Sequence, residues 1–326
     1  MSKSSRRHFI KKNILSGLFL TSAIPLLKAN TILESKSSIP TLNFNTSDYK
    51  FLYKCFILGN FNDLLIQLRV HADESFYAHP TFFQQLIHIK RPERLTKTHY
   101  RTIRTLFYKP HCYSVFKTLS FAKLLRYTIP PIKKVVDLPQ FDGYHQYAVD
   151  IHSLKCLYHL EHIEDDFIQS LWEALPNDEK VMLKIVVFLH DAGKGRKRDH
   201  HLVGASLFKV FAQKLKIEES LIEMGERLIT YHTLMSKVAQ REDIYSESVI
   251  LSFASHFNTK KLLDMIYILT YADMNGVGPG TYNSFNAKLI KTLYRNSLDV
   301  LGQTTIIDET QKRLKKELTL KRNAAF

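Results

Sequence analysis

The chain has 326 residues, which is enough for about two domains and a substantial hydrophobic core. Hydrophobic residues make up 45% of it, with only 11 Gly and 10 Pro, so collagen-like and low-complexity proteins are excluded. The three cysteines, Cys55, Cys112 and Cys156, form no C-x-x-C pair, which argues against a zinc ribbon or a disulfide framework. We interpret them as buried small hydrophobic residues.

The net charge of +15 is distributed unevenly along the chain. Residues 1–150 carry 22 Lys and Arg against 9 Asp and Glu, whereas residues 151–326 carry 24 against 22. The basic half contains no recognisable nucleic-acid-binding motif, so no nucleic-acid partner is predicted. The excess of positive charge instead favours partners that carry phosphate groups.

Residues 1–30 form a candidate targeting segment. Residues 5–11 read S-R-R-H-F-I-K, and the apolar stretch at 14–27 is too short to span a membrane as a helix. This pattern resembles a twin-arginine export signal, which implies a periplasmic location and transient contact with the membrane export machinery. The alternative is a basic helix that lies on a membrane surface, on a cytoplasmic protein.

After a Ser/Asn/Thr-rich linker at residues 30–48, apolar residues recur at helical spacing almost throughout. The helices expected before the first cluster of prolines cover residues 49–70, 80–90, 98–106 and 113–125. Pro130, Pro131 and Pro139 then interrupt the pattern and predict a domain boundary at 128–142. We therefore expect an all-α protein with a helical N-terminal region at 31–127 and a helical bundle domain at 128–326.

Ligand-type residues occur on the apolar faces of the helices expected in the second domain. His152 lies on the same helical stripe as apolar residues, and the apolar run 183–189 ends in His190 and Asp191. Asp273 similarly continues the stripe of Leu262, Ile266 and Leu269. A buried carboxylate costs several kcal/mol unless it is paired, and a metal ion is a suitable partner. The pattern thus indicates a metal site inside a helical bundle.

The order of these residues, H…HD…D, resembles the HD-domain metal-dependent phosphohydrolases. Four longer strings resemble one subgroup, the uridylyl-removing region of the bifunctional uridylyltransferase/uridylyl-removing enzymes, which act on the nitrogen-signalling protein PII. These strings lie at residues 145–152, 189–200, 231–236 and 269–284. The resemblance covers about residues 140–296.

The resemblance implies a site for one or two divalent transition-metal ions, each either Mn, Fe, Co, Ni or Zn. The residues implied for the first metal are His152, His190, Asp191 and Asp273. A second metal would share Asp191 and bind His200 and His232. We choose His200 over the adjacent His201 because it matches the family string and because neighbouring positions on a helix point about 100° apart.

Three basic residues are candidates for substrate binding. Lys194 and Arg196 follow the HD pair, where a cation can hold phosphate oxygens, although a solvated loop is the alternative. His145 also matches the family string. We assign catalytic roles to Asp191 and Lys194.

The expected reaction is the metal-dependent hydrolysis of a phosphoester, either a phosphodiester or a nucleotidyl ester. Its substrate would be a phosphorylated or nucleotidylated small molecule or protein. The D-x-D carboxylate pair of the family's nucleotidyltransferase domain is not found in the sequence, so uridylyltransferase activity is not predicted. We also expect no C-terminal sensing domain after the helix at 309–320. The alternatives are a non-catalytic HD-fold relic and a protein that binds an anionic partner.

Overall fold

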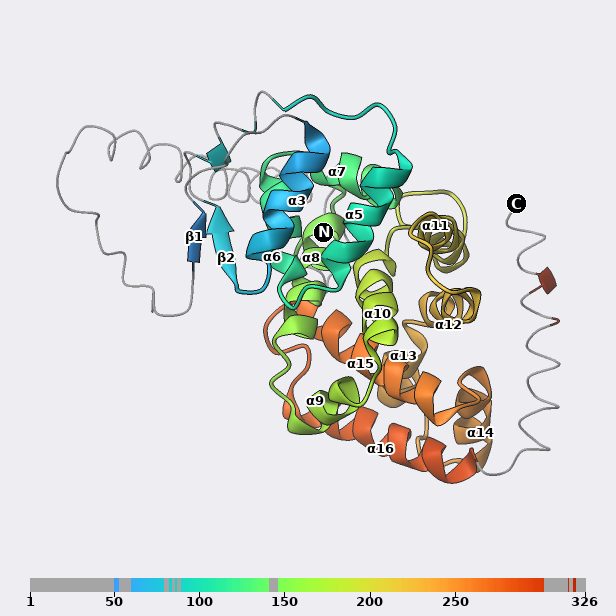
Figure 1. Cartoon of the computed structure of the whole chain (residues 1–326). Helices are drawn as coiled ribbons and strands as arrows, with labels where there is room; N and C mark the ends of the chain where they lie inside the picture. The colour runs from blue at the N-terminus through green and yellow to red at the C-terminus, as the bar shows by residue number, and fades with distance from the viewer. Residues whose placement is uncertain are drawn as a thin grey trace, which may run out of the picture.

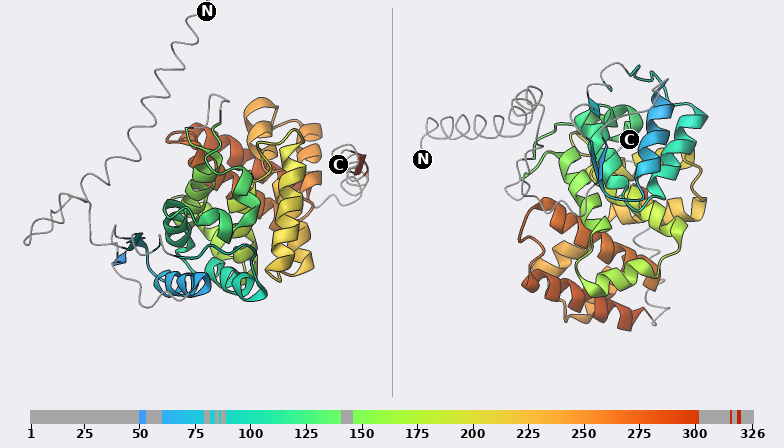
Figure 2. Two further views of the ribbon diagram at one scale, coloured as in Figure 1. Left: turned by 90° about the horizontal axis from the view of Figure 1, so that it is seen from above. Right: turned by 60° about the vertical axis from the view of Figure 1, so that its left-hand side comes forward.

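A computed structural model describes residues 50–52, 60–78, 82–83, 86, 89–140, 146–301, 316 and 319–320. The twin-arginine-like segment at 1–30, Cys55 and His145 lie outside these described residues. Most of the described chain is helical, which confirms the expected all-α class. Figure 1 shows the helices closely packed, with α3 and α5 near one end and α16 at the other, and Figure 2 shows the same arrangement from two further sides.

The N-terminal part contains the small departure from all-helical structure. Strand β1 (Lys50–Leu52) pairs in parallel with β2 (Phe76–Ala78), and helix α3 (Phe61–His71) lies between them in sequence. The helix expected over 49–70 was therefore wrong for its first residues. Asn60 caps α3 by accepting bonds from the backbone of Asn62 and Asp63, so the helix begins only there.

The remaining N-terminal helices follow the expected order. Phe82, Phe83 and Leu86 are helical, and α5 (Lys97–Phe107) and α6 (Cys112–Phe121) match two predicted helices. The short helix α7 (Leu125–Thr128) and a 3-10 turn (Pro130–Lys134) occupy the proline-rich segment. One hydrophobic cluster nevertheless extends from Phe61 to Tyr294, so both sides of the predicted boundary contribute to one core. The position of that boundary stays a prediction.

Three helices form the centre of the bundle. They are α8 (Val149–Glu161), α10 (Asn177–Leu189) and α15 (Lys260–Val277). Both α15 and α10 pack against α8. Gly276 permits a close approach of α15 to α8, because a Cβ atom there would lie 2.3 Å from Cys156 Sγ and 3.1 Å from the Cys156 backbone nitrogen.

Outer helices enclose this centre. The helices that cover it are α9 (Asp166–Glu173), α11 (His200–Lys214), α12 (Glu219–Thr230), α13 (Leu234–Arg241), α14 (Glu247–His256) and α16 (Ser284–Val300). The pair α11 and α12 packs together, and α16 contacts α13, α14 and α15. Of the segment at 309–320, the described residues are Lys316, Thr319 and Leu320. Among the described residues, no helix combines the length and apolar character needed to cross a lipid bilayer.

Candidate metal centre

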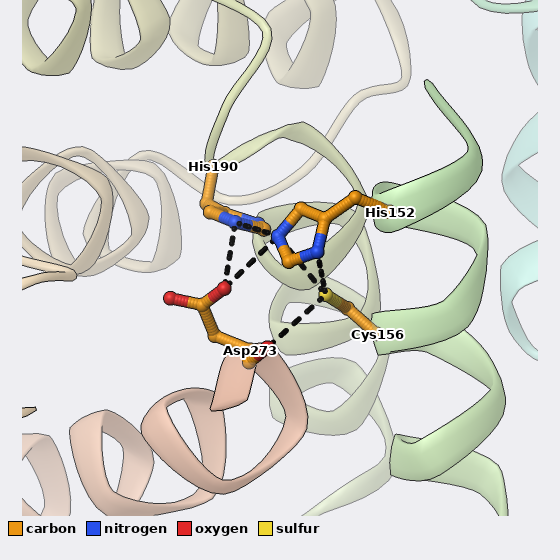
Figure 3. Close-up of side chains that lie close together, drawn as sticks. All are labelled: His152, Cys156, His190 and Asp273. Carbon is orange, nitrogen blue, oxygen red and sulfur yellow. Dashed lines mark hydrogen bonds and ion pairs between the residues drawn. The ribbon is translucent and has the colours of Figure 1, made fainter. Parts of the chain in front are cut away.

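Helices α8, α10 and α15 and the turn after α10 bring four of the predicted ligands to one point in the interior. His152 lies on α8, His190 is the C-cap of α10, and Asp191 follows directly in the turn. Asp273 comes from α15, and Figure 3 shows it facing His152 and His190. His152, His190 and Asp191 are at most 1% exposed. Apolar periodicity places these polar side chains inside because they occupy positions that otherwise carry core residues.

The first group of ligand atoms is tightly clustered. The Nε2 atoms of His152 and His190 are 3.2 Å apart. Asp273 Oδ1 lies 3.0 Å from Nε2 of His152 and 3.4 Å from Nε2 of His190. Asp191 Oδ2 is 3.7 Å and 3.6 Å from the same two nitrogens. These separations are close to those between neighbouring ligands of one transition-metal ion.

A second group of three histidines lies beside the first. His232 Nε2 is 3.6 Å from Asp191 Oδ1. The other carboxylate oxygen of Asp191, Oδ2, faces His152 and His190. Ligand atoms of His200, His201 and His232 all lie within 4.8 Å of one another. Asp191 is therefore placed between the two groups, as expected for a shared ligand.

Both adjacent histidines of α11 contribute to this second group. The ring of His201 is 4.8 Å from that of His232, whereas the ring of His200 is 6.1 Å away. Our expectation that only one of them turns inward does not describe this arrangement. The helix begins at His200, so both residues belong to its first turn, and both offer ligand atoms close to His232.

Backbone hydrogen bonds fix the orientation of two of the imidazoles. His190 Nδ1 is 2.8 Å from the Val187 carbonyl oxygen, and His232 Nδ1 is 2.8 Å from that of Ile229. In each ring, Nδ1–H donates to the carbonyl, so Nε2 faces the centre and offers its lone pair when the ring is neutral. Metal-binding histidines are commonly oriented in this way.

The pKa shifts differ between the two ligand groups. Burial lowers the pKa of His190, but the charges of Asp191 and Asp273 outweigh it and raise that pKa to about 9. Burial raises the pKa of Asp191, yet the positive charges of His190 and Lys194 hold it below its usual range. Burial lowers the pKa of His232 to about 3, and His190 acts in the same direction. The His232 imidazole is thus neutral and available as a ligand at physiological pH.

The two basic residues after the HD pair have different surroundings. Lys194 Nζ lies 2.7 Å from Asp191 Oδ2 and donates a 2.6 Å hydrogen bond to Gln140 Oε1. Arg196 Nη1 instead donates to the carbonyl oxygens of Ala192 and Lys194, at 2.6 Å and 3.2 Å. Lys194 therefore contacts the site, whereas the guanidinium of Arg196 binds the backbone of its own loop. A substrate contact of Arg196 stays a prediction, and His145 lies outside the described residues.

The donor set fits a metal ion. Asp191 Oδ1 is buried and has no hydrogen-bond partner among the described residues. A buried carboxylate oxygen without a donor is costly, and a cation at this point would satisfy it. Three overlapping groups of potential ligands occur here: His152–Cys156–His190–Asp273, His190–Asp191–His232 and His200–His201–His232.

Two neighbours of the site were not expected from the sequence. Cys156 lies one turn after His152 on α8, with its Sγ 3.4 Å from His152 Nε2. Its spacing of four residues from His152 was the available signal, because such residues share a helix face. Gln140 precedes the bundle by several residues, and no local pattern indicates its contact with Lys194.

Comparison with known proteins agrees with this geometry. Residues 149–259 match the model of the HD domain family. The bifunctional uridylyltransferase/uridylyl-removing enzyme of Cereibacter sphaeroides is 34% identical over 205 residues, covering 58% of this chain and 22% of the relative. The enzymes of the same name from Ruegeria pomeroyi and Rhodopseudomonas palustris are 35% and 36% identical, over 51% and 52% of this chain. The match spans about a fifth of the length of these curated relatives.

The resemblance stated from the sequence is thereby confirmed for the central part of the chain. The matched region contains His152, His190, Asp191 and His232, and Asp273 follows it on α15. The HD domain and the named relatives together support a metal-dependent phosphohydrolase in general. The chain therefore contains an HD domain at residues 149–259 and is homologous over about 58% of its length to the bifunctional uridylyltransferase/uridylyl-removing enzymes.

Proposed function

We propose that this protein hydrolyses a phosphodiester, with a nucleotidyl ester on a small molecule or a protein as its substrate class. The observation that carries the proposal is the convergence of imidazoles and carboxylates from separate helices, with Asp191 between two ligand groups. The relatives are named as uridylyl-removing enzymes, and removal of a uridylyl group is the cleavage of such an ester. The twin-arginine-like segment supports action in the periplasm.

The residues proposed to hold the first metal are His152, His190, Asp191 and Asp273, and those for the second are Asp191, His200 and His232. When bound, these ions supply a water that is activated at neutral pH and positive charge for the reacting phosphate. The protein itself orients the imidazole ligands. The carbonyls of Val187 and Ile229 hold two rings in place, and the apolar core around them limits access of bulk water.

Lys194 is the proposed partner of the substrate phosphate. Its side chain is partly exposed and its ammonium group lies next to Asp191, so it borders the centre without being enclosed. An ammonium group there can donate to a phosphate oxygen and offset the negative charge that develops during cleavage. When a cation binds the Asp191 carboxylate, the Lys194 ammonium group would leave Asp191 and contact the substrate phosphate instead.

The test uses the purified full chain, loaded with Mn(II) or Zn(II), and bis-para-nitrophenyl phosphate as a phosphodiester probe. Asp191→Asn should abolish release of nitrophenol, because it removes the charge from the bridging carboxylate. The matched control is Asp264→Asn, on α15, whose carboxylate is mostly buried but bonds Tyr294 and Lys260 away from the site. Wild-type turnover by Asp191→Asn, or no turnover by the loaded wild type, would refute the proposal.

A further inference from the structure

Cys156 occupies a position in the metal centre that the H…HD…D pattern does not account for. It lies four residues after His152 on α8, so both side chains are on the same face of the helix. Its side chain is fully buried, and Figure 3 shows the sulfur next to His152 and near the Asp273 main chain. The sequence alone had indicated only a small hydrophobic residue at this position.

The distance from Cys156 Sγ to His152 Nε2 is close to an edge of one coordination polyhedron. Zinc binds nitrogen and oxygen at about 2.0–2.2 Å and sulfur at about 2.3 Å, so neighbouring ligands of a tetrahedral site lie about 3.3–3.6 Å apart. Cys156 Sγ is 3.4 Å from His152 Nε2, and the edges within the His152, His190 and Asp273 trio measure 3.0–3.4 Å. The ligand atoms of all four residues lie within 4.8 Å of one another.

The surroundings of Cys156 keep its sulfur at this point. Gly276 on α15 leaves room for the sulfur, since any Cβ there would lie 2.3 Å from it. Asp191 Oδ2 faces the same group at 3.7 Å from His152 Nε2 and 3.6 Å from His190 Nε2. Its other oxygen is buried without a hydrogen-bond partner among the described residues and lies 3.6 Å from His232 Nε2. Asp191 thus links the two ligand groups, and the sulfur adds a further candidate ligand to the first.

We propose that Cys156 is a ligand of the metal held by His152, His190 and Asp273, and that its sulfur makes the centre favour Zn(II) over Mn(II). Thiolate ligands select zinc, whereas sites of carboxylate and water suit manganese. On binding, the thiol loses its proton to solvent and the sulfur forms a bond to the metal, without any change in oxidation state. The inference rests on the metal centre proposed above.

Cobalt(II) is the probe that separates this inference from the proposed function. The full chain is stripped of metal with a chelator and titrated with Co(II) under anaerobic conditions. Visible d–d bands report binding to the centre, and an intense near-ultraviolet band reports sulfur-to-cobalt charge transfer. The wild type and a C55S/C112S variant, in which Cys156 is the remaining thiol, should show both signals. Cys156→Ser should keep the d–d bands and lose the charge-transfer band.

Each other outcome contradicts the inference. Visible bands without charge transfer in C55S/C112S, or charge transfer that persists in Cys156→Ser, would show that Cys156 is not a ligand while leaving the metal centre in place. The absence of visible bands from every variant, with helical circular dichroism intact, would overturn both this inference and the proposed centre. Cys112 is a suitable control because it is equally buried but contacts Glu161 Oε1 at 3.0 Å.

A second measurement tests metal preference. Competition with a chromophoric chelator gives the affinities for Zn(II) and Mn(II). Cys156→Ser should weaken Zn(II) binding by at least about tenfold, since even residues outside the first coordination shell change metal affinity about 10- to 100-fold. Mn(II) binding should fall by less. An equal loss for both metals would contradict the proposed preference.

Discussion

A buried ion pair and its hydrogen bonds connect the HD domain to the N-terminal helices. Removing the pair tests how much this contact stabilises the protein. Lys184 Nζ on α10 lies 3.1 Å from Glu161 Oε1, at the end of α8, and donates to the carbonyl oxygens of Lys109 and Pro110. The side chains of Lys184 and Glu161 are only 6% and 1% exposed. Glu161 also accepts bonds from Cys112 and the Tyr113 backbone. The pair thus connects two central helices to the segment between α5 and α6.

Replacing Lys184 with Met keeps most of the length of the side chain and removes its charge. Among the described residues, Glu161 then keeps the thiol of Cys112 and the backbone N–H of Tyr113 as donors. The Lys109 and Pro110 carbonyls each lose the donor that Lys184 supplied. Breaking a buried pair by removing one partner costs about 3–5 kcal/mol, because the other charge is left uncompensated. In a chain of 326 residues, whose entropy of unfolding is about 0.7 kcal/mol/K, that loss lowers Tm by about 4–7 °C.

Urea unfolding followed by circular dichroism measures the free energy of unfolding of Lys184→Met, Glu161→Gln and the double variant. The double variant should be less destabilised than the sum of the two single variants, because no charge remains buried. Asp73→Asn is the control, since Asp73 pairs with Lys109 at 2.6 Å but both side chains are accessible to solvent, and its loss should cost less than about 1 kcal/mol. A cost for Lys184→Met no larger than the control's would refute the reasoning.

The other predictions concern the metal centre. The affinity for metal should rise by at least about tenfold per pH unit below about pH 9, because His190, whose pKa is raised to about 9, must lose its proton to bind, and the Cys156 thiol would release a further proton. Calorimetry in two buffers of different ionisation enthalpy would count the released protons, and a pH-independent affinity would contradict the prediction. Lys194→Ala should lower phosphodiester turnover by roughly tenfold or more while Lys197→Ala, on the exposed part of the same loop, leaves it unchanged in the same assay. Gly276→Ala should separate α15 from α8, lower stability by about 1–3 kcal/mol in urea unfolding and weaken Co(II) binding, and unchanged binding would show that this contact does not position the ligands.

The central ligands could be predicted because the apolar pattern of the helix that carries each of them determines whether its side chain is buried. His190 and Asp191 follow a continuous apolar run, and Asp273 continues a helical stripe, so their inward position follows from the helix that carries each of them. The helices α5, α10 and α15 likewise matched because their apolar spacing agrees with the faces that they bury.

Features that depend on contacts between distant segments were missed. Strand β1 exists because it pairs with β2, more than 20 residues away, and no local pattern announces that pairing. The contact of Gln140 with Lys194 has the same origin. The expectation that only one of the two adjacent histidines faces the centre did not anticipate that His200 and His201, at the first turn of α11, both offer ligand atoms within 4.8 Å of His232. The choice of His200 as the ligand stays a prediction.

The position of Asp191 explains why one short motif can organise the whole centre. It immediately follows the end of α10, so its carboxylate projects beyond the helix and reaches ligands from α8 on one side and His232 on the other. The preceding residue, His190, is held by the carbonyl of Val187 in the last turn of the same helix. The buried end of α10 therefore fixes two adjacent ligands at once. The other ligands come from α8, α11 and α15, which pack against α10, and from the turn after α12, which holds His232. A helical bundle brings such neighbours together, which is why widely separated residues can meet at this helix end.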